Sequence, residues 1–177
     1  MPNIEFSLSD LQNLLGKRIT SEELKEIILF YKGEVETIDV DTVRIDIKDT
    51  NRPDLWSVEG VSRELKGKLG IETGLPIMEA NKSNVTLKVE KKVEKIRPKI
   101  VCAIVKNLAL DDFSIKQMIQ LQEKICQTFG RNRYDVAIGV YDFDKLVPPV
   151  TYTSVKPSEM KFVPLGFSEE MTPKEIL

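Results

Sequence analysis

The titratable side chains limit the chemistry that this chain can perform. Its 177 residues include no histidine. This excludes nucleophile systems built on a Ser–His or Cys–His pair, and most zinc sites, because imidazole is their usual base or ligand. Any chemistry must therefore use carboxylates, lysines, hydroxyls, backbone amides or a bound substrate. We predict no catalytic residue, no cofactor-binding residue and no metal ligand in this chain.

Asp142 and Asp144 are the carboxylate pair whose spacing best fits acid–base chemistry. Two residues apart, they share a face on an extended backbone. Such a pair works as acid and base only where its surroundings separate the two pKa values. Lys145 and a Pro148-Pro149 pair follow directly. We therefore interpret the segment as a solvated loop with local ion pairs.

A second group of oxygen-bearing side chains suggests a calcium loop: Asp46, Asp49, Asn51 and Asp54. An EF-hand needs oxygen ligands at its first, third and fifth positions and glycine at its sixth. Counted from Asp46, the third position is Lys48, which would place a cation beside the metal. The pattern fails. We interpret the run as turn and cap chemistry, with Arg52 paired to a neighbouring carboxylate.

These residues belong to a polar elbow, the segment 48–60, which closes an extended segment and opens a helix. Pro53 removes a backbone donor and biases Arg52 toward extended geometry. Asp54 is expected to cap a helix that begins near Leu55. Apolar residues then recur at helical spacing and predict one buried face: Leu55, Val58, Val61, Leu65 and Leu69. We define the structural elbow by four side chains: Asp49, Asn51, Arg52 and Asp54.

Trp56 lies inside the elbow and allows two interpretations. A tryptophan beside Leu55 and Val58 on a helix is typical of a core or interdomain anchor. An accessible indole is also a platform on which a nucleic-acid base can stack.

The elements before the elbow have clear sequence signals. Residues 3–7 read as a strand, and Ser7 or Ser9 caps a helix that ends at Gly16. Thr20 and Glu23 form a capping box for a second helix, which glycine closes at position 33. Segments 34–40 and 42–47 alternate apolar and polar residues and predict a hairpin.

Residues 70–84 are rich in Gly, Pro, Asn and Ser, and they read as a connection. We place a domain boundary near residue 80, which gives a structural module over 1–80 and a second domain over 81–177. The second domain is predicted to contain strands at 85–89, 99–105, 136–141 and 150–155, with 99–105 buried on both faces. The fold class is α+β: a small module of helices and a β-hairpin, then an incomplete mixed α/β domain.

The longest predicted helix begins at Asp111 or Asp112 and ends at Gly130. Its apolar face is predicted from helical spacing: Ile115, Met118, Ile119, Gln122, Ile125 and Phe129. Cys102 and Cys126 are interpreted as buried, reduced thiols. Thr172 and Glu175 form another capping box just before Leu177, from which we expect the native sequence to continue.

Composition constrains the partners. With 41% hydrophobic residues, 31% charged residues and a net charge of −2, a surface coated by nucleic acid is excluded, although a local basic patch is not. Arg131 and Arg133 are the best local candidates for contact with a nucleic-acid phosphate. Neither a secretory signal nor a membrane span is recognisable, so we expect a cytoplasmic protein with no membrane partner.

Four ordered segments resemble one family. The elbow matches the signature NRPDLxSxEGxxRxL of the β subunit of archaeal and eukaryotic phenylalanine-tRNA synthetases. Three further segments are similar to that family: Leu8–Leu11 with its following glycine and second helix, residues 135–146, and FVPL at 162–165 followed by EEMTPKEIL at 169–177. The chain is identified as the N-terminal part of such a subunit, ending inside the editing domain.

The resemblance implies most of the function. The whole enzyme would be an α2β2 tetramer that joins phenylalanine to tRNA(Phe) with ATP and Mg²⁺, and aminoacylation would belong to the α subunit. The β subunit would supply assembly surfaces, tRNA contacts and an editing pocket that removes tyrosine. Editing is needed because a pocket for phenylalanine discriminates imperfectly against one added hydroxyl. Residues 1–80 would be B1-like and 81–177 the first part of the B3/4-like editing domain, so this segment alone would be inactive. Arg131 and Arg133 would then contact tRNA.

Two alternatives remain open. The chain could be a free-standing deacylase that acts on mischarged tRNA in trans. It could instead be a non-catalytic module for RNA binding or assembly, in which case binding would depend steeply on salt.

Overall fold

The computed structural model describes residues 3–49 and 51–177 and divides into two compact units. The first unit comprises Met1–Met78 and Leu108–Val140, and the second comprises Glu79–Asn107 and Tyr141–Leu177. Helices and small sheets occur together, which confirms the α+β class. The chain leaves the first unit near the expected boundary and returns to it for residues 108–140. The assignment of 1–80 and 81–177 as domains stays a prediction.

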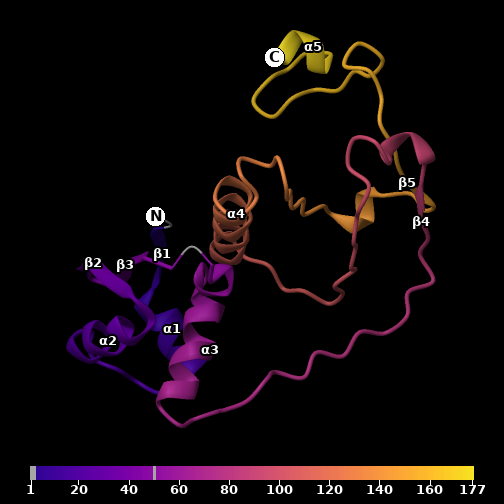
Figure 1. Ribbon diagram of the computed structural model, residues 1–177. Coiled ribbons are helices and arrows are strands. Elements are labelled where there is room, and N and C mark those ends of the chain that lie inside the picture. Colours follow the sequence, from indigo (N-terminus) through magenta and orange to yellow (C-terminus); the bar gives the residue numbers. More distant parts are fainter. Residues whose placement is uncertain (1–2, 50) are drawn as a thin grey trace. The chain divides into compact units, whose positions relative to one another are not determined.

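A three-stranded antiparallel sheet forms one layer of the first unit (Figure 1), with the strand order β1-β3-β2. Ile4 is paired with Ile45, which fixes the register of the edge strand β1 on the central strand β3. The predicted hairpin is confirmed, and its turn contains Val40 at φ 52°. The strands are β1 (Asn3–Ser7), β2 (Gly33–Asp39) and β3 (Thr42–Ile47).

Helices pack against this sheet, and the first two begin where the caps predict. The Ser7 hydroxyl accepts a hydrogen bond from the amide of Asp10, and Gly16 ends the helix at φ 68°, a left-handed conformation that glycine adopts without strain. Thr20 and Glu23 form both bonds of the capping box. The helices are α1 (Leu8–Leu15), α2 (Ser21–Ile28) with a 3₁₀ turn at Leu29–Tyr31, and α3 (Val58–Lys68).

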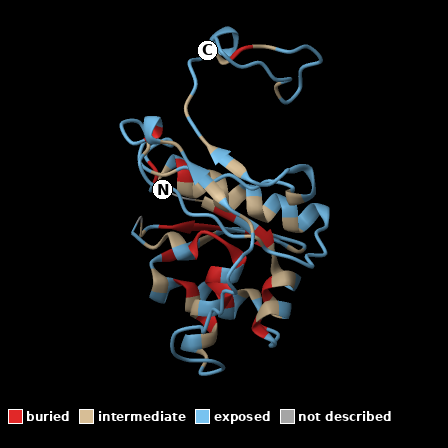
Figure 2. Ribbon diagram, turned by 90° about the vertical axis from the view of Figure 1, so that its right-hand side faces the viewer, coloured by how far each residue is buried: buried red, intermediate tan, exposed pale blue. Residues whose placement is uncertain are grey.

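The core lies between the sheet and these helices. Figure 2 shows most of the buried residues in this region. Alternate positions of the strands and one face of each helix supply it, as their periods of two and 3.6 residues require. Its buried members are Ile4, Phe6, Leu11, Leu15, Ile19, Leu24, Ile28, Val43, Ile45, Ile47, Leu55, Trp56, Val58, Val61 and Leu65.

The elbow helix begins later than the sequence predicts. Residues Pro53–Leu55 form a separate 3₁₀ turn, and α3 begins at Val58. Its cap is Ser57, whose hydroxyl accepts from the amide of Gly60 at 3.2 Å. The expectation that Asp54 caps this helix is wrong, because the Asp54 carboxylate is bound by Arg52.

The long helix α4 (Asp112–Gln127) is capped by Asp111, as predicted, but its docking face differs. Leu121 and Ile125 pack against the core of the first unit. Ile115 and Ile119, placed on the buried face by the sequence, are 42% and 53% exposed. Gln117 and Gln120 lie on the docking face and bond β1, and apolar spacing alone cannot identify them.

The second unit contains β4 (Leu87–Val89) and β5 (Val150–Tyr152), which pair in parallel, and the short helix α5 (Pro173–Ile176). Strand β5 is shorter than the predicted 150–155 strand. The capping box of Thr172 and Glu175 is confirmed.

The predicted strands 99–105 and 136–141 are absent from the described residues. A strand needs a neighbour for its N–H and C=O groups, and no described segment pairs with either one. Val101 is 97% exposed. Burial of both thiols was predicted; Cys126 is buried, but Cys102 is exposed because it lies in this unpaired segment.

Candidate functional site

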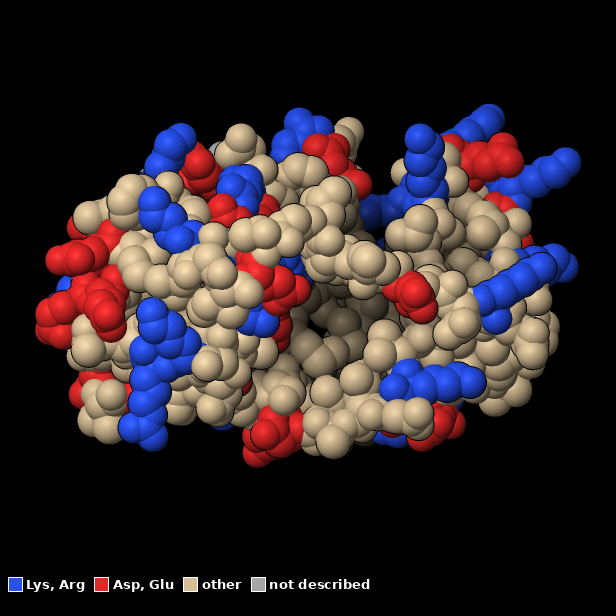
Figure 3. All heavy atoms as spheres, turned by 90° about the horizontal axis from the view of Figure 1, so that it is seen from below, with Lys and Arg blue, Asp and Glu red and all other residues tan. Residues whose placement is uncertain are grey.

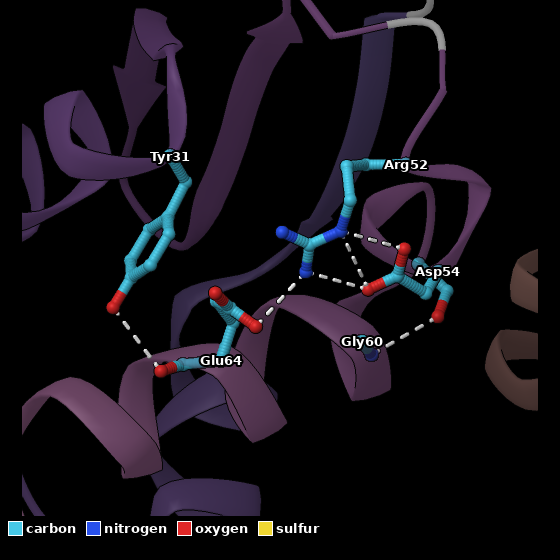
Figure 4. A network of polar contacts seen from close by, with 6 residues as sticks. Tyr31, Arg52, Asp54, Gly60 and Glu64 are labelled. Atoms are coloured by element: carbon cyan, nitrogen blue, oxygen red, sulfur yellow. Dashed lines mark hydrogen bonds and ion pairs between the residues drawn. The ribbon is translucent and has the colours of Figure 1, made fainter.

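The elbow is organised around the guanidinium of Arg52 (Figure 4). Its Nε donates to Asp54 Oδ1 at 3.0 Å, and its Nη2 donates to Asp54 Oδ2 at 2.8 Å. Nη2 also donates to Glu64 Oε2 on α3 at 3.0 Å. One planar cation thereby ties the 3₁₀ turn to the middle of α3, through the forked geometry that arginine offers to carboxylates. The expected pairing of Arg52 with a neighbouring carboxylate is confirmed.

The pairing sets the charge state of the elbow. Hydrogen bonds from Arg52 lower the pKa of Asp54, and the same bonds raise the pKa of Arg52. The Tyr31 hydroxyl donates to the backbone oxygen of Glu64 at 3.2 Å, and burial raises the pKa of that hydroxyl. The pKa shifts of Asp54, Arg52 and Tyr31 all move away from neutral pH, so these three groups keep their usual charge states there and the network binds the segments together.

Gly60 allows the elbow to close. A Cβ atom at this position would lie 1.6 Å from the backbone oxygen of Asp54. The first turn of α3 therefore passes so close to the preceding 3₁₀ turn that any side chain is excluded. The sequence signals did not identify this requirement, although the glycine lies within the quoted signature.

Trp56 is part of the core. Its side chain is fully buried among the apolar residues of the first unit. A base cannot stack on a ring that solvent does not reach, so the interpretation as an anchor is confirmed and the stacking platform is wrong.

The other two elbow residues lie at its edge. Asp49 forms an ion pair with Lys32 at 3.1 Å, and Asn51 is exposed at the turn. Asp46 is 7% exposed, and its Oδ2 accepts from the ammonium of Lys48 at 2.6 Å. The ammonium of Lys48 is thus bonded to the carboxylate that a calcium loop would need as its first ligand.

The candidate phosphate contacts Arg131 and Arg133 follow α4 in a turn with φ values of 47° and 67°. The structure brings each beside a carboxylate: Arg131 donates to Asp135, with one bond of 2.7 Å, and Arg133 donates to Glu123. These bonds raise the pKa of both guanidinium groups. A phosphate would have to compete with both carboxylates, and the contact with tRNA stays a prediction.

Asp142 and Asp144 lie together in a short 3₁₀ turn. The Asp142 carboxylate accepts from the amide of Asp144 at 3.1 Å and lies 3.5 Å from the ammonium of Lys145. This is the solvated, locally paired loop that the sequence predicts. Within residues 3–49 and 51–177, no three side chains of metal-ligating type are grouped for an ion.

A carboxylate that the sequence analysis left unassigned links the hairpin to α1. Asp41 accepts hydrogen bonds from the Ser9 amide at 2.8 Å, the Ser9 hydroxyl at 2.9 Å and the Ser7 hydroxyl. Its backbone oxygen also accepts from the amide of Leu8 at 2.7 Å. Because the Ser7 hydroxyl donates to it, the pKa of Asp41 is lowered. This contact could have been predicted from the sequence, because an aspartate in the hairpin turn accompanies a helix that starts with Ser-x-Ser.

Both signs of charge are distributed across the face shown in Figure 3. No described helix is long and apolar enough to cross a membrane. The fold is an α+β module in which charged side chains of the elbow link backbone segments of the first unit.

Comparisons with known proteins identify the family. The phenylalanine–tRNA ligase β subunit of Pyrococcus horikoshii is 51% identical over the whole chain, that of Thermococcus onnurineus 49%, and that of Methanosphaera stadtmanae 37%. The chain spans 32% of the length of each. No family model matches it.

A solved structure agrees with the sequence comparison. It is the crystal structure of an N-terminal fragment of the phenylalanyl-tRNA synthetase β subunit from P. horikoshii, with a TM-score of 0.92 and 51% identity. The similarity covers 99% of this chain and 51% of that one. Over its whole length the chain is similar to the N-terminal part of phenylalanine–tRNA ligase β subunits, which confirms the resemblance seen in its four segments.

Proposed function

We propose that this chain is the N-terminal part of a subunit that supports the attachment of phenylalanine to tRNA(Phe). The similarity to ligase β subunits over the whole chain carries the proposal. Residues 1–80 form a B1-like structural module, and 81–177 form the first part of an editing domain that removes tyrosine from mischarged tRNA(Phe). Aminoacylation requires the α subunit in an α2β2 tetramer, which works in the cytoplasm.

ATP and Mg²⁺ belong to the α subunit in this proposal. The charged groups of the elbow are already paired: Arg52 with two carboxylates, and Asp49 with Lys32. Such groups suit the positioning of backbone segments. We therefore assign the elbow an architectural role and Arg131 and Arg133 a contact with tRNA.

Co-purification with an α subunit tests the proposal. The protein, at the length of its relatives, is produced with and without an archaeal phenylalanine–tRNA ligase α subunit. We expect a complex of two α and two β chains by light scattering, and phenylalanine charging only when both chains are present. A β chain that stays alone, or that leaves charging unchanged, contradicts the proposal. Steep salt-dependent tRNA binding without a complex would favour an RNA-binding module.

A further inference from the structure

At Glu5, the outer edge of β1 is bound by the side chain of Gln120. Strand β1 lies at the end of the sheet, where a strand leaves N–H and C=O groups without a ladder partner. The backbone amide of Glu5 donates to Gln120 Oε1 at 2.8 Å, and Gln120 Nε2 donates to the backbone oxygen of Glu5 at 3.0 Å. The carboxamide makes both bonds that a residue of a neighbouring antiparallel strand would make.

A second glutamine orients the first. Gln117 Nε2 donates to the same Glu5 oxygen at 3.0 Å, and Gln120 Nε2 lies 3.2 Å from Gln117 Oε1. The two residues are one helical turn apart, so both side chains reach the strand from the same face of α4. The backbone oxygen of Glu5 thus uses both of its lone pairs.

Apolar contacts continue this face. Leu121 and Ile125 pack against the core of the first unit and follow Gln117 at intervals of four residues. Figures 1 and 2 both show α4 lying beside β1. Apolar burial favours the approach of α4 without fixing its position along the strand, because hydrophobic contact is not directional. The paired hydrogen bonds at Glu5 provide that direction.

We propose that Gln120, oriented by Gln117, is a latch that replaces a missing strand and fixes helix α4 on the β1 edge. Residues 108–140 belong to the first unit and are flanked in the sequence by segments of the second on both sides. The latch therefore holds residues 108–140 in the first unit, although the chain continues into the second unit at both ends of this segment. This inference concerns contacts inside the first unit and does not depend on the proposed function.

Gln120→Glu tests the latch in the 177-residue chain. The substitution keeps the length of the side chain but removes the donor and sets a carboxylate against the Glu5 oxygen. Repulsion between this carboxylate and the Glu5 oxygen should move the whole side chain away and so break the bond from the Glu5 amide as well, which we expect to exchange with deuterium about tenfold faster. The amide of Ile45, on the central strand, should be unchanged. The matched control is Gln127→Glu on the same helix, since Gln127 bonds Glu123 and not β1.

Acid should reverse the effect of Gln120→Glu, because the introduced carboxyl group, once protonated, again offers one donor and one acceptor. Below about pH 4 the protection of the Glu5 amide should return to the wild-type value at the same pH. That comparison is needed because other charged groups, Lys116 among them, line the same hollow. The acids that line the same hollow are Glu5, Asp10, Asp41 and Asp111. Unchanged exchange at Glu5, an equal loss of protection at Ile45, or no recovery in acid would overturn the latch.

Discussion

Gly60 is the residue of the elbow whose replacement the structure tolerates least. The Asp54 carbonyl occupies the space that a Cβ atom would need. A methyl group can enter only if the 3₁₀ turn moves away from α3, which would break the alignment of Arg52 with Glu64. The glycine is therefore required by close backbone approach, since its φ is not among the positive ones.

Gly60→Ala should destabilise the first unit by about 3 kcal/mol or more, because the clash involves backbone on both sides. Denaturation followed by circular dichroism measures this change. Gly67→Ala on the same helix is the control: its Cβ would meet nothing closer than 3.8 Å. That substitution should stabilise by about 0.5–1 kcal/mol through helix propensity. Equal effects at the two sites would contradict the account of the elbow.

Asp41 gives the first unit a pH dependence of known sign. Its folded pKa is lowered below 3.8, so its contribution is complete above the unfolded pKa and is lost as pH falls through the folded pKa. Asp41→Asn should cost about 1 kcal/mol at pH 7, since a charged acceptor at a helix start is lost. The difference between variant and wild type should shrink below about pH 4.

Urea denaturation of both proteins at each pH checks this prediction. Burial raises the pKa of Asp10, as do the charges of Glu59, Asp111 and Asp41, and its contribution therefore has the opposite sign. Comparing the two proteins at the same pH removes most of that background. A difference that is as large in acid as at neutral pH would show that the Asp41 charge is irrelevant.

At the scale of elements, local signals predicted most of the helices and the hairpin of residues 3–68, but they also predicted strands at 99–105 and 136–141 that the described residues lack. The caps, hairpin and apolar stripes could be recognised because each pattern and its partner lie within a short stretch of sequence. Strands 99–105 and 136–141 were predicted from apolar composition, but a strand forms only with a neighbour, which composition does not report. The face of α4 was predicted only in part: Ile125 packs against the core as expected, but the two glutamines that bind β1 are not marked by apolar spacing.

The polar contacts of the elbow were predictable only in part. Pairing of Arg52 with a nearby carboxylate could be inferred from the density of charge around Pro53. The partner Glu64 could not, because it depends on where α3 begins. Helix α3 is capped by Ser57 and not by Asp54. With that start, Glu64 lies on the side of the helix that faces the elbow and bonds Arg52.

Arg52→Lys tests the link between the two elements. A lysine keeps the charge but not the fork that binds Asp54 and Glu64 together. The side chain is 37% exposed, so solvent screens the charge, and we expect a loss of about 1 kcal/mol. The matched control is Arg44→Lys, whose single bond to Glu5 a lysine can replace. Equal stability of both variants in thermal denaturation would mean that the forked geometry contributes nothing.

At the scale of the whole molecule, the proposed tRNA contact makes a prediction about salt. Substituting Arg131→Gln and Arg133→Gln together should weaken tRNA binding and reduce its log–log salt slope by about 1–2. Filter binding across salt concentrations measures the slope. Lys145→Gln with Lys156→Gln serves as the control, since these lysines also form local ion pairs. An unchanged slope would show that the two arginines do not contact tRNA and form only their local ion pairs.

We propose that this chain supplies architecture to a ligase and performs no chemistry alone. Tyrosine attached to tRNA(Phe) is the substrate that separates this claim from a free-standing deacylase. The most direct measurement incubates the 177-residue chain with Tyr-tRNA(Phe) and follows release of tyrosine. We predict release at the rate seen in buffer, and faster release only when the β subunit has the length of its relatives and is assembled with α. Multiple turnovers by the 177-residue chain alone would contradict the account.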